Sequence, residues 1–593
     1  MLGNIIGYEE NIALIKLNVD LTQMKNLINM YVIMEDEERQ CIGEIIGITN
    51  NIAKVNLVGE VIDSKFVYGV IANPSFSSSV KLVGKEKMPI IIGVENYQND
   101  KHLYLGKSAL YPEIKVGVDI NDFFSNHFAI FGSTGSGKSC SVSRIFQNLF
   151  EKEQTIPYRA SIFIFDAYGE YHQAFSQLNK KNPNINFKSY TTNLNFPDTE
   201  IIKIPPWLLT VDDYALLLEA ESASQLPIIE KALKLVSVFA REENEVLKSK
   251  NDIIARALLD ILSSGRPSSQ IRDQIISVLS SYNTSELNLD TIIYQPGYNR
   301  PLRQCFFIDQ NGKIRDIETI IDFLEKFLTE NVELNLPDGS FKYTLKDLRD
   351  AFDFALISEG SLKSDKVYDL ANVLKVRIHT LVSGDYSKYF ELDDYLSKDE
   401  FVRQLLLSSN GRKAQIINFN INYVDDRFAK SLTKIYSKFL FDYAKGLEKR
   451  GTLPFNIVLE EAHRYVQNDN DVAILGYNIF ERITKEGRKY GVMLGLISQR
   501  PSELSSTTLS QCSNFLIFKM LHPTDIDYIR EIIPNITDDI VKRLKVLQPG
   551  MCISFGSAFK VPVIVKFEMP DPRPSSDSCD VSRIWFVNTA NNN

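Results

Sequence analysis

The chain has 593 residues, of which 44% are hydrophobic and 24% charged, and its formal net charge at pH 7 is −9. This length allows several domains with sizeable cores. The acidic balance argues against general coating of nucleic acid, although a local ring of basic residues can still contact DNA. No apolar run reaches about 18 residues, no secretion signal is present and the cysteines and histidines are dispersed, so we expect a cytoplasmic protein without a membrane span, disulfide framework or zinc site.

Residues 1–83 consist of short apolar segments separated by turn residues. The alternation of apolar and polar side chains predicts strands at 12–17, 31–34, 41–48, 53–58 and 66–71. Short strands at this spacing predict a small β-barrel or sandwich. Because the segment carries no evident catalytic residue, we interpret it as a docking or assembly module. The next predicted domain, 84–207, begins with strand-like residues at 89–94 and 102–106.

A phosphate-binding loop follows an apolar strand predicted at 128–131. Its sequence fits G-x-x-x-x-G-K-[ST], and the apolar residues after it recur at helical spacing. The glycines allow backbone N–H groups to turn towards phosphate oxygens at the N-terminus of a helix. Lys138 is expected to reach the β- and γ-phosphates, and the Ser139 hydroxyl to bind Mg²⁺. The predicted nucleotide-binding residues are Gly132, Ser133, Thr134, Gly135, Ser136, Gly137, Lys138, Ser139 and Cys140.

A second apolar run, at 160–166, has the character of a strand buried on both faces. It ends at Asp166, and the carboxyl ends of parallel strands form the edge where α/β sheets bind ligands. Asp166 and the following Glu170 are therefore candidates for the site. The same two residues also fit a turn and a helix cap, and the sequence leaves both interpretations open.

Residues 208–410 change to helical periodicity. Apolar residues recur at intervals of three and four, as at 228, 232, 235, 236 and 239 and at 254, 258, 261 and 262. This pattern predicts a mostly helical insertion, with strand pieces near 291–294 and 305–308. Its Lys and Arg residues alternate with acids, so we interpret them as solvated faces and assign none to DNA.

The core is expected to resume over 411–569 with a strand at 414–419 and an amphipathic helix at 426–447. An apolar run at 455–459 then ends in Glu460 and Glu461. This pair fits the second nucleotide motif, in which one acid holds Mg²⁺ through water and its neighbour polarises the attacking water. Glu460 is the predicted metal residue and Glu461 the predicted general base. The alternative is a strand end followed by a charged helix start.

Another buried strand, at 492–497, ends in Ser498, Gln499 and Arg500. Gln499 is placed to sense the γ-phosphate or the attacking water. Three arginines, namely Arg482, Arg488 and Arg500, are candidates for stabilising charge in the transition state, although arginines near helix ends are also common on surfaces. Strands at 515–519, 552–555 and 561–565 complete the set. The tail, 570–593, ends in an apolar patch at 584–587, which we expect to dock on the protein's own core or, as we prefer, on a neighbouring subunit.

The segments GSTGSGKS, DAYGEY, VLEEAH and EGRKYGVMLGLISQRPSEL occur in this order. Together they resemble HerA, the hexameric DNA-translocating ATPase of the HerA/FtsK branch of RecA-like motors. The resemblance implies an α/β fold with a RecA-like core, an N-terminal barrel like the family's HAS-barrel, a helical insertion and a C-terminal tail that braces a neighbouring subunit.

The same resemblance assigns roles in the site. Lys138 and Ser139 match the phosphate and Mg²⁺ residues, Glu460 and Glu461 the acid pair, and Gln499 the polar sensor. Arg488 matches an arginine used near the γ-phosphate. Some relatives carry an arginine that acts across the subunit interface just before the loop strand, and Asn126 occupies that position here.

The family implies a homohexameric ring that threads double-stranded DNA, hydrolyses ATP with Mg²⁺ and works with an effector protein. That effector is a NurA-type nuclease in repair operons, and a sirtuin-like NAD-hydrolysing protein or another nuclease in bacterial anti-phage operons. A second hypothesis is an assembly scaffold whose nucleotide state gates a bound effector. A GTPase switch is disfavoured because no N-K-x-D-type segment follows a strand.

Overall fold

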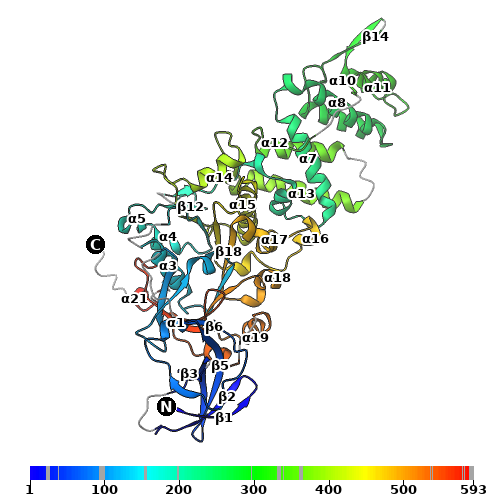
Figure 1. The fold of residues 1–593 in the computed structure, drawn as a ribbon. Coiled ribbons are helices and arrows are strands. Elements are labelled where there is room, and N and C mark those ends of the chain that lie inside the picture. The colour runs from blue at the N-terminus through cyan, green and yellow to red at the C-terminus, as the bar shows by residue number, and fades with distance from the viewer. Residues whose placement is uncertain are drawn as a thin grey trace. The chain divides into compact units, whose positions relative to one another are not determined.

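The computed structural model describes the chain except for residues 22–26, 38, 93–99, 152–156, 196–198, 296, 330–334, 338, 359–364, 534–535, 537, 577–578, 580 and 586–593. The chain forms two compact units (Figure 1). Unit 1 comprises Met1–Glu200, Val402–Asn468 and Ile479–Asn593, and unit 2 comprises Ile201–Phe401 and Asp469–Asn478. All the nucleotide-site residues expected from the sequence belong to unit 1.

Unit 1 begins with a closed β-barrel, as expected. Its strands follow the order β2-β1-β7-β3-β4-β5, and β2 also pairs with β5, so the sheet closes on itself while β6 extends it beyond β5. Alternate side chains point inward because side chains on successive strand residues face opposite sides, and Ala13, Ile15 and Val55 are fully buried. The strands are β1 (Gly3–Glu9), β2 (Ile12–Leu17), β3 (Tyr31–Glu35), β4 (Gln40–Thr49), β5 (Ile52–Ile62), β6 (Lys65–Tyr68) and β7 (Ser79–Leu82).

Two segments differ from the strands expected there. Residues 88–92 form the short helix α1 (Met88–Ile92), and the rest of the strand predicted at 89–94 lies outside the described residues. Met88, Ile91 and Ile92 are buried at helical spacing, which a short apolar run does not distinguish from a strand. Cys305 ends helix α10 (Leu302–Cys305), and only Ile308 makes a β-bridge in the strand predicted at 305–308.

The core of unit 1 is a twelve-stranded sheet in the order β13-β12-β16-β11-β17-β18-β10-β19-β20-β21-β8-β9. The pairs from β12 to β19 are parallel, and those from β19 to β9 are antiparallel. The parallel strands are β12 (Phe187–Thr191), β16 (Ile416–Asn420), β11 (Ile162–Asp166), β17 (Phe455–Leu459), β18 (Val492–Ser498), β10 (Phe128–Phe131) and β19 (Asn514–Phe518). The remaining strands are β13 (Glu200–Ile201), β20 (Met551–Gly556), β21 (Val563–Phe567), β8 (His102–Ser108) and β9 (Lys115–Asp119).

Helices connect these strands. The principal ones are α2 (Ile120–Phe124), α3 (Lys138–Phe150), α4 (Tyr171–Phe175), α5 (Leu178–Lys181), α14 (Lys398–Leu406), α15 (Asp426–Gly446), α17 (Ile479–Glu486), α18 (Ser506–Leu509), α19 (Pro523–Ile532), α20 (Asp538–Leu544) and α21 (Val581–Trp585). Because β17, β18 and β10 are adjacent and parallel, their carboxyl ends lie along one edge of the sheet. This edge carries the predicted site.

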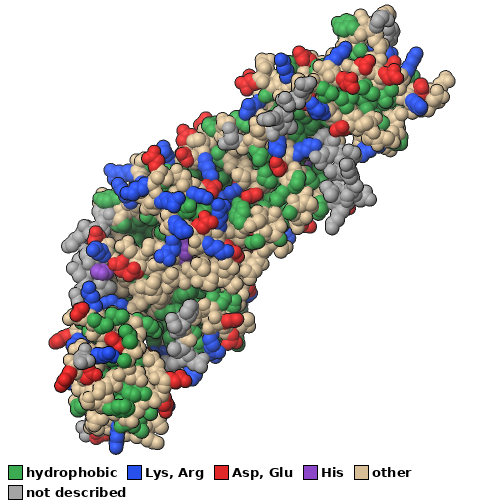
Figure 2. Space-filling model, turned by 45° about the vertical axis from the view of Figure 1, so that its right-hand side comes forward, with side chains coloured by type: hydrophobic (Ala, Val, Ile, Leu, Met, Phe, Trp, Pro, Cys, Tyr) green, Lys and Arg blue, Asp and Glu red, His purple; other side chains and the backbone are tan. Residues whose placement is uncertain are grey.

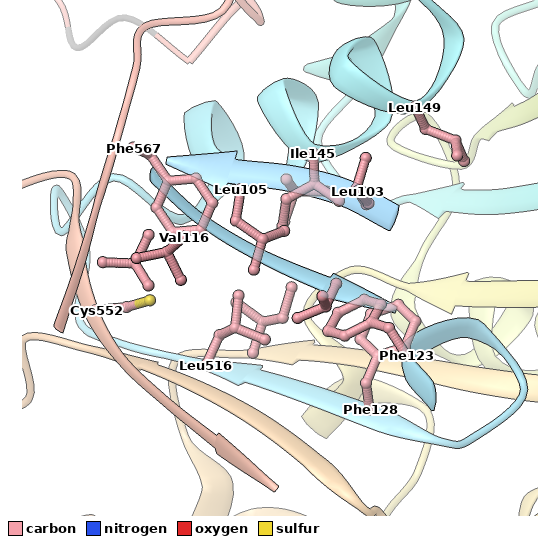
Figure 3. Packing of buried hydrophobic residues seen from close by; sticks show 14 of the residues in the cluster. Leu103, Leu105, Val116, Phe123, Phe128, Ile145, Leu149, Leu516, Cys552 and Phe567 are labelled. Atoms are coloured by element: carbon pink, nitrogen blue, oxygen red, sulfur yellow. The ribbon is translucent and has the colours of Figure 1, made fainter. Parts of the chain in front are cut away.

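Helix α3 packs against the sheet through its apolar face (Figure 3). Ile145 of α3, Leu105 of β8 and Phe128 of β10 are at most 3% exposed, and each buried side chain of this size contributes about 1.5–3 kcal/mol relative to leaving it in water. The cluster fixes α3 directly behind the phosphate loop.

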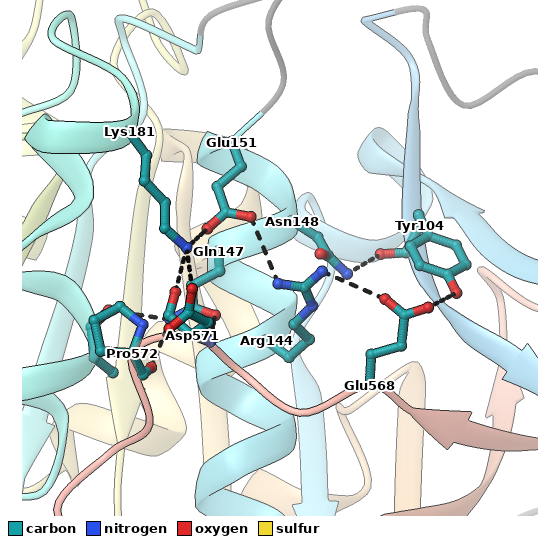
Figure 4. Close-up of polar contacts among 10 residues, drawn as sticks. Tyr104, Arg144, Gln147, Asn148, Glu151, Lys181, Glu568, Asp571 and Pro572 are labelled. Atoms are coloured by element: carbon teal, nitrogen blue, oxygen red, sulfur yellow. Dashed lines mark hydrogen bonds and ion pairs between the residues drawn. The ribbon is translucent and has the colours of Figure 1, made fainter.

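A C-terminal strap, residues 568–575, crosses the outer side of α3 (Figure 4). Gln147 of α3 accepts the Asp571 N–H at 3.0 Å and donates to the Pro572 carbonyl at 2.9 Å. Glu568 accepts hydrogen bonds from Tyr104 at 3.0 Å and Arg144 at 3.4 Å. The strap therefore binds α3 of its own chain. Beyond it, Trp585 of α21 is 78% exposed, and residues 586 and 587 of the expected apolar patch lie outside the described part.

Unit 2 is mostly helical, with one two-stranded sheet formed by β14 (Ile292–Gln295) and β15 (Tyr298–Pro301). Its helices are α6 (Val211–Leu217), α7 (Leu226–Phe239), α8 (Glu243–Leu262), α9 (Ser268–Ser281), α10, α11 (Ile317–Glu325), α12 (Leu345–Ser358), α13 (Asp365–Ser383) and α16 (Asp471–Leu475). Acidic and basic side chains are mixed over its surface (Figure 2). The limits expected for the insertion, 208 and 410, remain predictions. Within the described residues, no helix combines the length and apolar character that a bilayer crossing requires.

Candidate functional site

The phosphate loop leaves the sheet from the end of β10 and enters α3. Its first residues are held by the neighbouring strands: Ser133 donates its N–H to the Lys519 carbonyl at 2.9 Å, just after β19, and Gly132 to the Ser498 carbonyl at 3.3 Å, at the end of β18. The loop is thus anchored on both sides, which is the preorganisation that a backbone anion site needs.

Gly137, directly before α3, shows why the loop requires glycine. Its φ is +96°, and a Cβ there would lie 2.7 Å from the backbone nitrogen of Gly550. That nitrogen donates to the Ser136 carbonyl at 2.9 Å, so the turn before β20 lies tightly against the loop. Any larger residue at 137 would displace this turn and change the direction of the loop N–H groups.

Lys138 is 8% exposed, and its ammonium group donates to the Gly132 carbonyl at 2.7 Å and the Ser133 carbonyl at 3.2 Å. Burial lowers the pKa of Lys138, while Glu461, Glu460 and Glu170 act in the opposite direction. The positive charge therefore lies inside the loop and close to three carboxylates.

Gln499 connects the loop to the acid pair. Its Oε1 accepts the Thr134 hydroxyl at 2.5 Å, and its Nε2 donates to Glu461 Oε1 at 2.5 Å. A carboxylate oxygen only accepts, so this contact fixes which end of the amide faces Glu461. The strand-end glutamine, the loop and the paired glutamates thus meet at one place.

Glu461 adopts left-handed backbone angles, φ 47° and ψ 47°, and is 4% exposed. Such angles cost a residue with a side chain about 1–3 kcal/mol and cluster at functional sites. Glu461 Oε2 has no hydrogen-bond partner, although His463 Nδ1 lies 3.3 Å away. One oxygen is therefore fixed by Gln499, and the other remains available to a reacting water.

His463 is a site residue that the motifs did not single out. Its Nδ1 lies 3.1 Å from the Ser498 hydroxyl, whose oxygen accepts the Arg500 N–H at 3.0 Å. Burial lowers the pKa of His463, which favours the neutral ring. Nδ1 therefore lies between the Ser498 hydroxyl and Glu461 Oε2, at 3.1 Å and 3.3 Å. Its position three residues after Glu460, at a strand end, is the only signal in the sequence.

Glu460 is 3% exposed, and its Oε2 has no hydrogen-bond partner. Burial raises the pKa of Glu460 well above its usual value, and Asp166 and Glu170 raise it further. A buried carboxylate with a free oxygen, close enough to Lys138 of the loop to raise the pKa of that lysine, fits a Mg²⁺ ion that arrives with a triphosphate. Among the described residues no group of three or more His, Cys, Asp or Glu side chains forms a ready-made cage. Mg²⁺ held largely by phosphate oxygens and water needs none.

Arg488 lies away from these residues within its own subunit. It follows α17 in the turn before β18, whereas Gln499 follows the other end of that strand. Seven strand residues at about 3.3 Å each separate the two positions by roughly 20 Å. Arg482 pairs with Glu486 in α17, and Arg500 pairs with Glu503 at 2.8 Å beside the site. A triphosphate held by the loop would therefore lie out of reach of Arg488 of the same chain.

His127 lies at the start of β10, on the same side as Arg488. Its Nδ1 accepts the Leu494 N–H at 2.9 Å, so its Nε2, 3.1 Å from the Thr484 carbonyl, is the protonated nitrogen. The ring is fully buried, and burial is the main reason that the pKa of His127 is lowered to about 4. His127 therefore holds the start of the loop strand as a neutral ring.

Acidification is expected to destabilise the fold through His127. Between the ordinary pKa of 6.5 and the folded value of about 4, the unfolded chain binds a proton that the folded chain does not. The contribution of His127 to the free energy of unfolding is constant above pH 6.5. As the pH drops to 4, the free energy of unfolding falls by about 3 kcal/mol. Thermal unfolding of wild type and His127→Gln across this range isolates the imidazole, since the carboxylates titrate in both. Equal pH dependence in the two proteins would contradict the assignment.

Comparison with known proteins gives consistent matches over most of the chain. Residues 103–374 match the family described as "Helicase HerA, central domain". The DNA double-strand break repair helicase HerA of Sulfurisphaera tokodaii is 25% identical over 516 residues, which cover 86% of this chain and 77% of that protein. HerA of Pyrococcus furiosus is 22% identical over 79% of this chain and 70% of its own length. Among solved structures, the bacterial conjugative coupling protein TrwB aligns with a TM-score of 0.41 and 12% identity, over 83% of this chain and 94% of TrwB.

Proposed function

Because the chain belongs to the HerA family of helicases, we propose that it is an ATP-driven translocase or helicase that moves along double-stranded DNA. The observation that carries the proposal is the convergence of three strand ends: the loop after β10, the acid pair after β17 and Gln499 after β18. The relatives named as DNA repair helicases support a role in DNA processing.

The proposed chemistry assigns one task to each group. Lys138 and the loop N–H groups would hold the β- and γ-phosphates, and Ser139 and Glu460 would hold the Mg²⁺ that neutralises the triphosphate. Glu461 Oε2 accepts a proton from the attacking water, and Gln499 orients the Glu461 carboxylate through its other oxygen. Hydrolysis of ATP then requires positive charge on the γ-phosphate in the transition state.

We propose that Arg488 supplies that charge to the site of a neighbouring subunit. It is exposed at the edge of the sheet opposite its own loop. Asn126, at the position where some relatives have an arginine, is buried and donates to the Asp122 carbonyl at 2.8 Å. A head-to-tail ring, which we propose to be a hexamer, would bring the Arg488 edge of one subunit to the loop edge of the next.

Arg488→Ala is expected to lower the ATPase rate about 1,000-fold, because arginines that act in this way contribute roughly 10³–10⁵ to turnover. ATP binding should persist, since the Lys138 loop is unchanged. Lys489→Ala, an exposed neighbour in the same turn, is the matched control and should retain full turnover. An unchanged ATPase rate in Arg488→Ala would show that Arg488 is an ordinary surface charge without a role in hydrolysis.

Motor activity is tested by DNA-stimulated ATP hydrolysis together with displacement of a third strand from a triplex. The alternative, a nucleotide-gated scaffold, predicts ATP-dependent activation of a bound effector without displacement.

Exposed apolar side chains on the barrel, such as Val67 (48%) and Tyr68 (56%), favour a docked protein there. We propose a NurA-type nuclease, a sirtuin-like NAD-hydrolysing protein or another nuclease as that effector, in DNA repair or anti-phage defence. The exposed helix α21 is the proposed brace on the next subunit.

A further inference from the structure

Glu170 lies at the candidate nucleotide site, but the proposed hydrolysis of ATP assigns it no task. It follows the turn after β11 and immediately precedes α4. Burial raises the pKa of the Glu170 carboxyl and the Ser139 side chain lowers it through a hydrogen bond, which places Glu170 next to the residue expected to bind Mg²⁺. Its Oε2 is buried and has no hydrogen-bond partner.

The ordinary explanation for an acid at this position is a helix cap, and the contacts exclude it. The Glu170 side chain makes no capping hydrogen bond to α4. Asp166 performs that task, because its carboxylate accepts the N–H groups of Glu170 at 3.0 Å and Tyr171 at 2.9 Å. The two acids of this turn therefore have different tasks, and the Glu170 carboxylate is left to face the loop.

The backbone of Glu170 is fixed from both sides. Its N–H is held by Asp166, and its carbonyl accepts the Ser575 N–H of the C-terminal strap at 2.9 Å. The preceding Gly169 has φ +74°, and a Cβ there would lie 2.8 Å from the Asn420 amide nitrogen. A turn held in this way places the carboxylate without a large entropic cost, as a binding site requires.

A second buried group also points to a ligand here. Glu460 is 3% exposed, and its Oε2 has no partner. Glu170 and Glu460 lie close enough to affect each other and Lys138 electrostatically. A triphosphate that bound here without a divalent cation would bring its negative charges close to the carboxylates of Glu170 and Glu460 in a poorly solvated environment.

We propose that Glu170 is a positioning residue for Mg²⁺: its carboxylate orients the Ser139 hydroxyl and accepts hydrogen bonds from water in the magnesium shell. This inference rests on the proposed function, and it extends the site beyond Ser139 and Glu460. Glu170 thereby makes nucleotide binding depend on the divalent cation. Removing its charge should weaken the response to Mg²⁺ without weakening the metal-free contacts of the loop.

The test is equilibrium binding of a fluorescent ATP analogue to the full chain, in EDTA and across a Mg²⁺ titration. Glu170→Gln should raise the Mg²⁺ concentration for half-maximal binding about 10-fold, as loss of an outer-shell ligand partner commonly does. Binding in EDTA should be equal or tighter, because one negative charge is gone. Glu151→Gln, just past the far end of α3, is the control and should match wild type.

Three outcomes decide the proposal. An unchanged Mg²⁺ requirement in Glu170→Gln overturns it, and so does an equal loss of binding in EDTA, since that indicates a structural role. Glu170→Asp keeps the charge on a shorter side chain and should raise the Mg²⁺ concentration for half-maximal binding by less. It provides a second variant if the Glu170→Gln protein folds poorly. If the wild-type protein bound no nucleotide, the proposed function itself would fail. If wild type and Glu170→Gln showed the same Mg²⁺-dependent binding, only this inference about Glu170 would fail.

Discussion

Replacing Lys138 with alanine is expected to abolish measurable nucleotide binding and, with it, hydrolysis. The ammonium group is the one positive charge buried among the described loop residues 132–140, and it lies within hydrogen-bond distance of two loop carbonyls. Truncating a buried charged partner of this kind costs roughly 2–5 kcal/mol, which corresponds to a loss of affinity of about 30-fold to several thousand-fold. Isothermal titration with ATP and Mg²⁺ measures the change directly.

The matched control for this substitution is Lys180→Ala, which removes an exposed lysine on α5 and should leave binding intact. Lys138→Ala also removes the two contacts that hold the ammonium in the loop, so its thermal unfolding should be compared with wild type. Retention of near-normal affinity by a folded Lys138→Ala protein would show that the triphosphate binds elsewhere.

Glu461→Gln is expected to separate binding from turnover. The amide preserves the size of the side chain but cannot take the proton of the attacking water, and a well-placed general base contributes about 10²–10⁴ to the rate. We therefore expect hydrolysis to fall about 1,000-fold while ATP affinity stays within a few-fold of wild type. Single-turnover hydrolysis measures the expected loss of rate, and equilibrium binding on the same preparation measures the retained ATP affinity.

Glu486→Gln, at the partly exposed last residue of α17, is the control and should behave as wild type. If Glu461→Gln continued to hydrolyse ATP at the normal rate, the base would have to be another group. His463 would then be the first candidate, because its ring nitrogen lies 3.3 Å from the same carboxylate.

The sequence predicted which segments meet at the candidate site, because each part carries its own local signal. The glycine pattern defines the loop, and buried strands ending in Glu460, Glu461 and Gln499 define its neighbours. Parallel strands present their carboxyl ends at one edge, so these residues had to meet once β17, β18 and β10 were adjacent. The direct link from Gln499 to Thr134 and Glu461 follows from that adjacency.

Other features depend on contacts that no local pattern encodes. The strand expected at 89–94 begins as helix α1, because a short apolar run packs equally well in either form until its neighbours are known. Asp166 and Glu170 had two open interpretations, and only their hydrogen bonds assign the cap to Asp166. Strand direction, not the motif itself, places Arg488 at the edge opposite its own loop.

The most direct test of the account is the ATPase rate per chain measured against protein concentration, with the mass of the particle determined at each point. A site completed by the neighbouring subunit's Arg488 predicts negligible turnover for single chains and full turnover once rings have assembled. Single chains that hydrolyse ATP at the full rate would contradict the shared site.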